Sequence, residues 1–180
     1  TPISAIDAGV GHVPEDRIGM GLLPGLSVRE NLILKGYRKP PLSEGLRLNH
    51  KAIIEFAWQL INLFSINPPN PETPVTLLSG GNQQKVILSR EITGENKLLI
   101  AVHPTMGLDV AATEFVRTTL REQRRKGVAV LLISEDLDEL LDLSDRLAVM
   151  YEGQIKGIIR PGEVSIEEIG LMMAGEQVTL

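Results

Sequence analysis

The sequence contains no cysteine, few aromatic residues and no long apolar run. Without cysteine among its 180 residues, the chain can form neither a disulfide framework nor a metal site with cysteine ligands. The longest uninterrupted apolar run, Val128 to Ile133, is far shorter than the roughly 20 residues that a transmembrane helix needs. A formal net charge of −5 argues against a protein with a broad basic face for nucleic acid.

Histidine is also scarce, and the three histidines are scattered over the chain at His12, His50 and His103. They form no His-x-x-x-His pair, and no Ser-His-Asp or Cys-His arrangement is recognisable. We therefore expect no metal site and no self-sufficient hydrolase of these kinds. Length and composition are those of one globular domain, or of one domain with a small subdomain.

The first half of the chain shows helical periodicity and strong helix-start signals. Ser27, with Glu30 three residues later, predicts a capping box, and Asn49 is a second good N-cap. Four prolines within 67–74 exclude a helix or a central strand there. We expect a strand and a long loop over 1–26, a loop over 38–45, and helices over 28–34, 50–64 and 81–92.

The second half alternates short apolar strands with amphipathic helices, which is typical of an α/β fold with a largely parallel sheet. We expect strands over 98–102, 128–133, 147–151 and 154–159, and helices over 110–126, 137–143 and 165–173. The expected organisation is a strand and loop of the core at 1–26, a helical subdomain at 27–95, the rest of the core at 96–162, and a closing helix and tail at 163–180.

The stretch "LLSGGNQQK" at 77–85 predicts a helix whose first turn faces an anion. The first N–H groups of a helix have no partner within it and carry partial positive charge. Gly80 and Gly81 allow a ligand close to that backbone, and Ser79 adds a hydroxyl. This combination suits a phosphate. The alternative is that Ser79 only caps the helix and that the glycines serve the turn.

Several further motifs occur with this one in a fixed order. "HVPEDR" and "LSVRENL" precede it, "LSRE" and "PTMGLD" follow it, and "LLISEDLDELLDLSDRLAVMYEGQI" closes the series. Together they resemble the ATP-binding subunit of an ABC transporter over about residues 5–175. The sequences "PEDR" and "GGNQQK" are most similar to those of the second nucleotide-binding domain of simple-sugar and nucleoside importers.

The resemblance implies a P-loop NTPase core of the ABC ATPase type, with a helical subdomain that carries the signature. The family's P-loop, G-x-x-x-x-G-K-[ST], is missing, since the chain contains no Gly-Lys dipeptide. In the family the P-loop lies upstream of the glutamine loop. We therefore expect a truncated core, the C-terminal part of the second nucleotide-binding domain, without its P-loop strand.

Other positions of the family pattern are altered. The Walker B Asp and Glu, which would serve Mg²⁺ and the attacking water, fall at Val102 and His103. The switch histidine falls at Glu135, whose carboxylate would repel a phosphate, and the glutamine-loop position carries Glu15. The resemblance thus implies a degenerate half-site with no intact catalytic residue and no metal ligands.

The signature, in contrast, is intact. The resemblance implies that it contacts, in trans, an ATP held by the P-loop of the first nucleotide-binding domain, and that Asp109 belongs to the D-loop. The expected signature residues for ATP are Ser79, Gly80, Gly81, Asn82 and Gln83. For Asp109, capping of the following helix is the alternative, and both roles can hold at once.

The resemblance also implies a setting for the chain. It lies on the cytoplasmic side of a membrane, bound to permease subunits and indirectly to a solute-binding protein, with ATP and Mg²⁺ in the parent assembly. Alone, the chain is expected to be inactive, to hold neither ligand, and to self-associate through unpaired strand edges. The alternatives are a non-catalytic regulatory module, and the C-terminal half of a signature ATPase of the chromosome or DNA-repair type.

Overall fold

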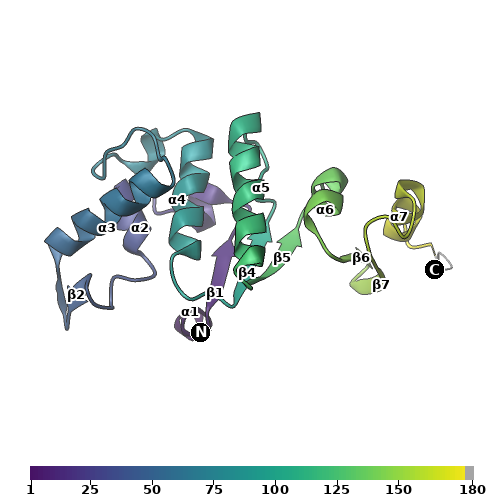
Figure 1. The fold of residues 1–180 in the computed structure, drawn as a ribbon, viewed down its shortest axis with the longest axis horizontal. Coiled ribbons are helices and arrows are strands. Elements are labelled where there is room, and N and C mark those ends of the chain that lie inside the picture. The colour runs from purple at the N-terminus through teal and green to yellow at the C-terminus, as the bar shows by residue number, and fades with distance from the viewer. Residues whose placement is uncertain (177–180) are drawn as a thin grey trace. The chain divides into compact units, whose positions relative to one another are not determined.

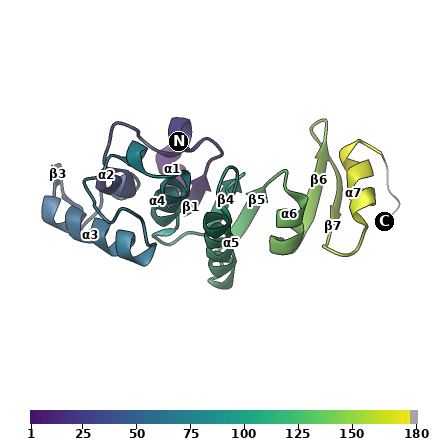
Figure 2. The same ribbon diagram turned by 90° about the horizontal axis from the view of Figure 1, so that it is seen from above.

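The computed structural model describes residues 1–176, which are drawn as ribbons in Figures 1 and 2. The chain divides into two compact units, Thr1–Ile133 and Ser134–Leu180. Each unit has its own sheet and its own helices, and each is described by itself. No helix among the described residues is long and apolar enough to cross a membrane.

The first unit is built on a parallel sheet of three strands in the order β1-β4-β5. The strands are β1 (Val10–Val13), β4 (Leu98–Val102) and β5 (Ala129–Ile133). Register places Val13 beside Ala101 and Val102 beside Ile133, so the carboxyl ends of the strands share one edge. The helix α5 (Val110–Arg125) connects β4 to β5. This arrangement confirms the expected α/β fold with a parallel sheet.

Three further helices of this unit are α2 (Val28–Ile33), α3 (His50–Leu63) and α4 (Gly80–Ile92). Figure 1 shows α4 between the pair α2 and α3 on one side and α5 on the other. The core of α4 is fully buried at Val86, Ile87 and Leu88, so this helix is enclosed by its neighbours. A 3-10 turn at Val75–Leu77 leads into it.

The second unit consists of α6 (Leu137–Leu143), the hairpin of β6 (Leu147–Tyr151) and β7 (Gln154–Ile159), and α7 (Ile166–Met173). Glu152 and Gly153 both have positive φ, as a two-residue hairpin turn of type I′ requires. The turn predicted at these residues is therefore confirmed. A small apolar core joins the hairpin to α7: Leu147, Val149, Ile159, Ile169 and Met172.

Two expectations for loops are wrong. Within 1–26 the chain forms α1 (Pro2–Asp7) and a π-helix (Arg17–Gly21) besides the expected strand. Thr1 and Pro2 start α1, since Thr1 caps it and proline suits the first turn. Within the expected loop 38–45, Ser43–Glu44 (β2) pairs with Arg47–Leu48 (β3). Strands of two residues are too short to show a period in the sequence.

Candidate functional site

The helix α4 begins where the sequence predicts the anion site. Ser79 is its N-cap, and the Ser79 hydroxyl accepts hydrogen bonds from the backbone N–H of Asn82 (3.4 Å) and from Asn82 Nδ2 (2.9 Å). Ser79 is exposed and Gly80 and Gly81 are half-buried. The N–H groups of the two glycines belong to the first turn, which has no acceptors for them within the helix. The geometry is that of an open helix end that can receive an anion.

The loop that follows β4 reaches the same end of α4. A cavity of about 170 Å³ is lined by Ser79, Gly81, Asn82 and Lys85 of the α4 segment, and by Asp109, Ala111, Ala112 and Phe115 of the α5 segment. The structure therefore brings the signature and the predicted D-loop residue together. Asp109 also caps α5, because its Oδ1 accepts from the N–H of Ala112 (2.8 Å).

Helix packing also requires a glycine at position 81. A Cβ at this position would lie 2.9 Å from the Cβ of Ala112, so only glycine lets α4 and α5 approach this closely. At Gly80 a Cβ would meet its nearest neighbour, Nη2 of Arg17, at 3.7 Å, which is ordinary contact. The glycine that is free for a ligand is thus Gly80, while Gly81 also serves the helix contact.

The amide side chains of α4 support the loops around the site. Asn82 Oδ1 accepts from the N–H of Asn67 (2.8 Å), which holds the proline-rich loop against the helix. Gln83 is buried, and its Nε2 donates to the carbonyl of Val75 (3.3 Å). Any contact of Gln83 with an anion would therefore be made by its backbone or after a side-chain rearrangement.

Two supporting residues escaped the sequence analysis. Gln84 is almost fully buried and donates from Nε2 to the carbonyl of Pro104 (2.7 Å). Arg17 Nη1 donates to the carbonyl of Met106 (2.8 Å). Both side chains hold the loop between β4 and α5. The only available signals were the arginine of "PEDR" and the second glutamine of "GGNQQK", and neither pattern specifies a partner.

The carboxyl end of β4 carries Val102 and His103, where the resemblance places the altered Walker B positions. Val102 and His103 are half-buried, and the N–H of His103 donates to the carbonyl of Ile133 (2.8 Å). Glu15 is exposed in the segment after β1. Among the described residues, no group of three or more histidine and acidic side chains could hold a metal ion. The residues present do not fit Mg²⁺, since the side chain of Val102 has no ligand atom and that of His103 offers only an imidazole nitrogen.

Glu135 belongs to the second unit. It is exposed and lies directly before Asp136, which caps α6. Of the site residues expected from the sequence, the structure gathers Ser79, Gly81, Asn82 and Asp109 around one cavity. Val102 and His103 lie at the carboxyl end of β4.

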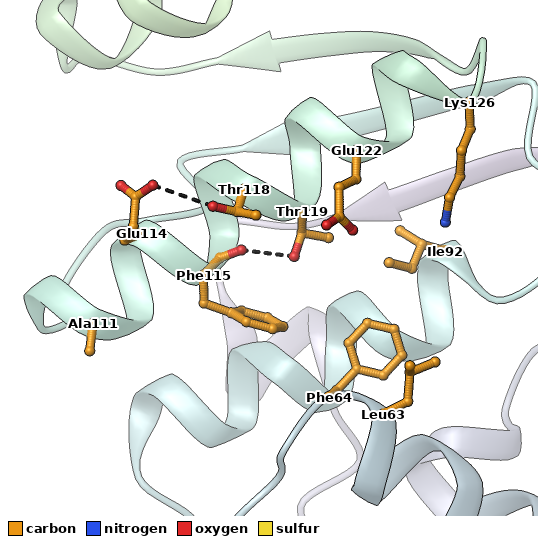
Figure 3. A pocket seen from close by; sticks show the side chains of 10 residues that line it. All are labelled: Leu63, Phe64, Ile92, Ala111, Glu114, Phe115, Thr118, Thr119, Glu122 and Lys126. Carbon is orange, nitrogen blue, oxygen red and sulfur yellow. Dashed lines mark hydrogen bonds between the residues drawn. The ribbon is translucent and has the colours of Figure 1, made fainter.

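A second cavity of about 660 Å³ lies between the carboxyl end of α3 and α5. Figure 3 shows Phe64 and Phe115 facing each other across it. Their rings meet edge to face with centroids 6.3 Å apart, and Lys85 Nζ lies 5.1 Å from the centroid of Phe115. None of the residues predicted for the anion site lines this cavity, so we assign it no ligand.

Comparison with known proteins gives close relatives. No family model matches the chain. It is 46% identical over 176 residues to the guanosine import ATP-binding protein of Bacillus subtilis, covering 97% of this chain and 34% of that protein. It is 42% identical over 177 residues to the nucleoside import ATP-binding protein of Lactococcus lactis, covering 98% and 35%. The ribose import ATP-binding protein of Bacillus subtilis is 39% identical over 178 residues, with 97% and 35% covered.

Solved structures agree on the fold. An ATP-binding subunit of an ABC transporter matches with a TM-score of 0.72 at 22% identity, covering 96% of this chain and 71% of that one. A dimeric ATP-binding cassette with bound ADP and phosphate matches with a TM-score of 0.69 at 18% identity, covering 86% and 64%. The fold is thus that of the ABC ATPases. The chain spans about a third of the length of the curated relatives it matches.

Proposed function

We propose a role for this chain from its homology to nucleoside and sugar import ATP-binding proteins. The homologous region is about one third of the length of each of those proteins. We propose that the chain supplies the "LSGGNQQK" signature to an ATP site whose P-loop lies on a partner domain. The observation that carries the proposal is the open first turn of α4, with Ser79 and Gly80 at its end and Asp109 beside it. A helix end of this kind binds phosphate through backbone N–H groups.

The proposed assembly follows from this role. The partner is a first nucleotide-binding domain, which provides the P-loop and the ligands of Mg²⁺, because Val102 and His103 offer this chain no such set. Permease subunits then hold the pair at the cytoplasmic face of a membrane. A solute-binding protein delivers a nucleoside or a sugar to them.

The second half of the proposal is that the chain's own half-site hydrolyses ATP poorly. A positioned carboxylate orients the attacking water in phosphoryl transfer. His103 stands where that carboxylate is expected, and Glu135 stands where a histidine is expected. One competent site, completed by the signature, would carry the turnover of the assembly.

The test uses a chimaera. Residues 1–180 replace the matching third of the guanosine import ATP-binding protein of Bacillus subtilis, and hydrolysis of Mg-ATP is measured with and without Ser79→Ala. Loss of a hydrogen bond to a charged phosphate should lower turnover about tenfold or more. His103→Ala should leave turnover nearly unchanged.

Ser165→Ala is the matched control. Ser165 is likewise a serine N-cap, here of α7, and its Oγ accepts from the N–H of Glu168 (3.2 Å). Ser165→Ala removes a helix cap, and Ser165 is not among the residues that line the cavity at Ser79. Equal effects of Ser79→Ala and Ser165→Ala, or a loss of turnover with His103→Ala, would overturn the proposal.

A direct titration of Mg-ATP into the 180-residue chain separates the signature from a complete pocket. A helix end without a P-loop contributes only a few phosphate contacts, so we expect a dissociation constant of about a millimolar or weaker. Micromolar binding with one ATP per chain would mean that the chain holds a nucleotide pocket of its own.

A further inference from the structure

We propose that Arg17 is an additional anion-binding residue of the α4 site, placed there by the segment after β1. The inference rests on the proposed function, because it takes the phosphate at the end of α4 as its ligand. Arg17 opens the π-helix Arg17–Gly21, far from the signature in the sequence.

The position of the guanidinium is defined by three neighbours. Nη1 donates to the carbonyl of Met106 (2.8 Å). Nη2 lies 3.7 Å from the point where a Cβ of Gly80 would be, and 3.6 Å from the corresponding point at Gly107. The charged group therefore stands between the first residue of α4 and the loop that leads to Asp109.

Arg17 forms no ion pair within the described part of the chain. None of the ion pairs of residues 1–176 includes Arg17, whereas Arg29 pairs with Glu72 and Arg90 with Glu91. The nearby carboxylate of Asp16 accepts from the N–H groups of Ile18 and Gly19. A half-buried cation without a carboxylate, beside a helix end that attracts anions, fits a ligand with negative charge.

The loop does not depend on Arg17 alone. Gln84 holds the carbonyl of Pro104 from the α4 side (2.7 Å), and Asp109 caps α5. An arginine has five donors in a planar fork that suits phosphate oxygens. The hydrogen bond to Met106 uses one of them, so the fork keeps donors for a ligand while it rests on the loop.

The experiment compares two substitutions in the chimaera. Arg17→Gln keeps a donor for the Met106 carbonyl and removes the charge, and Arg17→Lys keeps the charge. We expect Arg17→Gln to raise the KM for Mg-ATP about tenfold, as for one lost charge-assisted contact. Arg17→Lys should stay within about threefold of the parent, because ammonium also binds phosphate as a point charge. The temperature of thermal unfolding should be the same for both.

Arg38→Gln is the control, since Arg38 is an exposed arginine that stacks on Tyr37 at 5.2 Å and lies on another loop. It should leave the KM unchanged. An unchanged KM in Arg17→Gln would overturn the inference. So would equal losses in Arg17→Gln and Arg17→Lys with lower unfolding temperatures, which indicate a structural role.

Ser79→Ala in the same chimaera separates this inference from the proposed function. If Ser79→Ala has no effect, the phosphate site itself is wrong. If Ser79→Ala lowers turnover while Arg17→Gln does not change the KM, only the role of Arg17 is wrong. Added salt provides a second readout, because the difference between the parent and Arg17→Gln should shrink as a charge contribution is screened.

Discussion

At the scale of single residues, the two glycines of the signature differ in what they tolerate. A methyl group at Gly81 would lie 2.9 Å from the Cβ of Ala112, while one at Gly80 has room. We expect Gly81→Ala to lower the free energy of unfolding by about 1–3 kcal/mol, as overpacking does. Urea unfolding of the chain measures this change.

Two variants test the cause of that loss. Gly80→Ala should change stability much less, and Ala112→Gly should restore part of what Gly81→Ala loses, because it removes the clashing methyl group. Equal destabilisation by the two alanine substitutions would contradict the packing argument. The comparison also shows why Ser79, rather than Gly81, is the cleaner probe of phosphate binding.

At the scale of elements, one buried carboxylate joins β1, the turn after α2, and α4. Glu91 accepts from Lys35 Nζ (2.9 Å), from Arg90 Nε (2.9 Å) and from the N–H of His12 (3.0 Å). Its side chain is only 6% exposed. Glu91→Gln would leave two cations without their counter-charge, so we expect a loss of about 3–5 kcal/mol in the free energy of unfolding.

Chemical denaturation of Glu91→Gln checks this value. Glu114→Gln is the matched control, since Glu114 lies 3.5 Å from Arg121 on the exposed side of α5. Surface pairs contribute about 0–1 kcal/mol. If both variants lose the same small free energy of unfolding, the Glu91 cluster does not hold these elements together. The presence of Arg90 and Glu91 in "LSRE" would then need another explanation.

The start of α2 predicts a dependence of stability on pH. Hydrogen bonds from the hydroxyl (2.6 Å) and the N–H (2.8 Å) of Ser27 hold the pKa of Glu30 below its ordinary value. A carboxyl group with a lowered pKa stabilises the folded chain above its unfolded pKa. That contribution is lost as the pH falls through the folded pKa, that is, below about pH 4.5.

Unfolding of the chain and of Glu30→Gln, followed between pH 7 and lower pH, tests this contribution. The stability difference should be largest near neutral pH and should vanish in acid. Glu55→Gln is the control for the loss of a surface carboxylate, because Glu55 lies 4.0 Å from Lys51 in an exposed pair. A difference that stays constant with pH would contradict the role of the Ser27 bonds.

At the scale of the whole molecule, the three-stranded sheet of the described residues has two edge strands, β1 and β5, and β5 carries exposed apolar side chains. Among residues 1–176, β5 pairs with β4 on one side only. Its Leu131 and Ile133 are 50% and 45% exposed, although they are apolar. Open apolar edges recruit another strand. We therefore expect the average mass of the chain in solution to rise with concentration.

Sedimentation at several concentrations measures this self-association. Leu131→Lys places a charge on the strand, a device that natural edge strands use against pairing, and should shift the distribution towards the monomer. Leu63→Lys is the control for a surface charge elsewhere, because Leu63 is exposed at the end of α3. A monomer at all concentrations would contradict the predicted self-association through β5.

Much of the local structure was predictable because its signals are local. Helix starts at Ser79 and Asp109, the proline-rich loop and the turn at Glu152 all follow from capping, missing N–H groups and backbone preference. Apolar runs such as 98–102 predict the strands in the same way. The helix of 2–7 and the short β2 and β3 were missed, since their signals are weak or brief.

The sequence by itself determined the order of the elements, the helix start at Ser79 with two glycines in its first turn, and the side chains of Val102 and His103 at the end of the apolar run of β4, since each depends on residue type and spacing along the chain. Only the tertiary structure decided which distant residues meet. It set Arg17 beside Gly80, placed Asp109 at the signature cavity, and made Gly81 a contact between helices. Such encounters depend on the packing of the sheet and helices, and packing brings together segments that no local pattern connects.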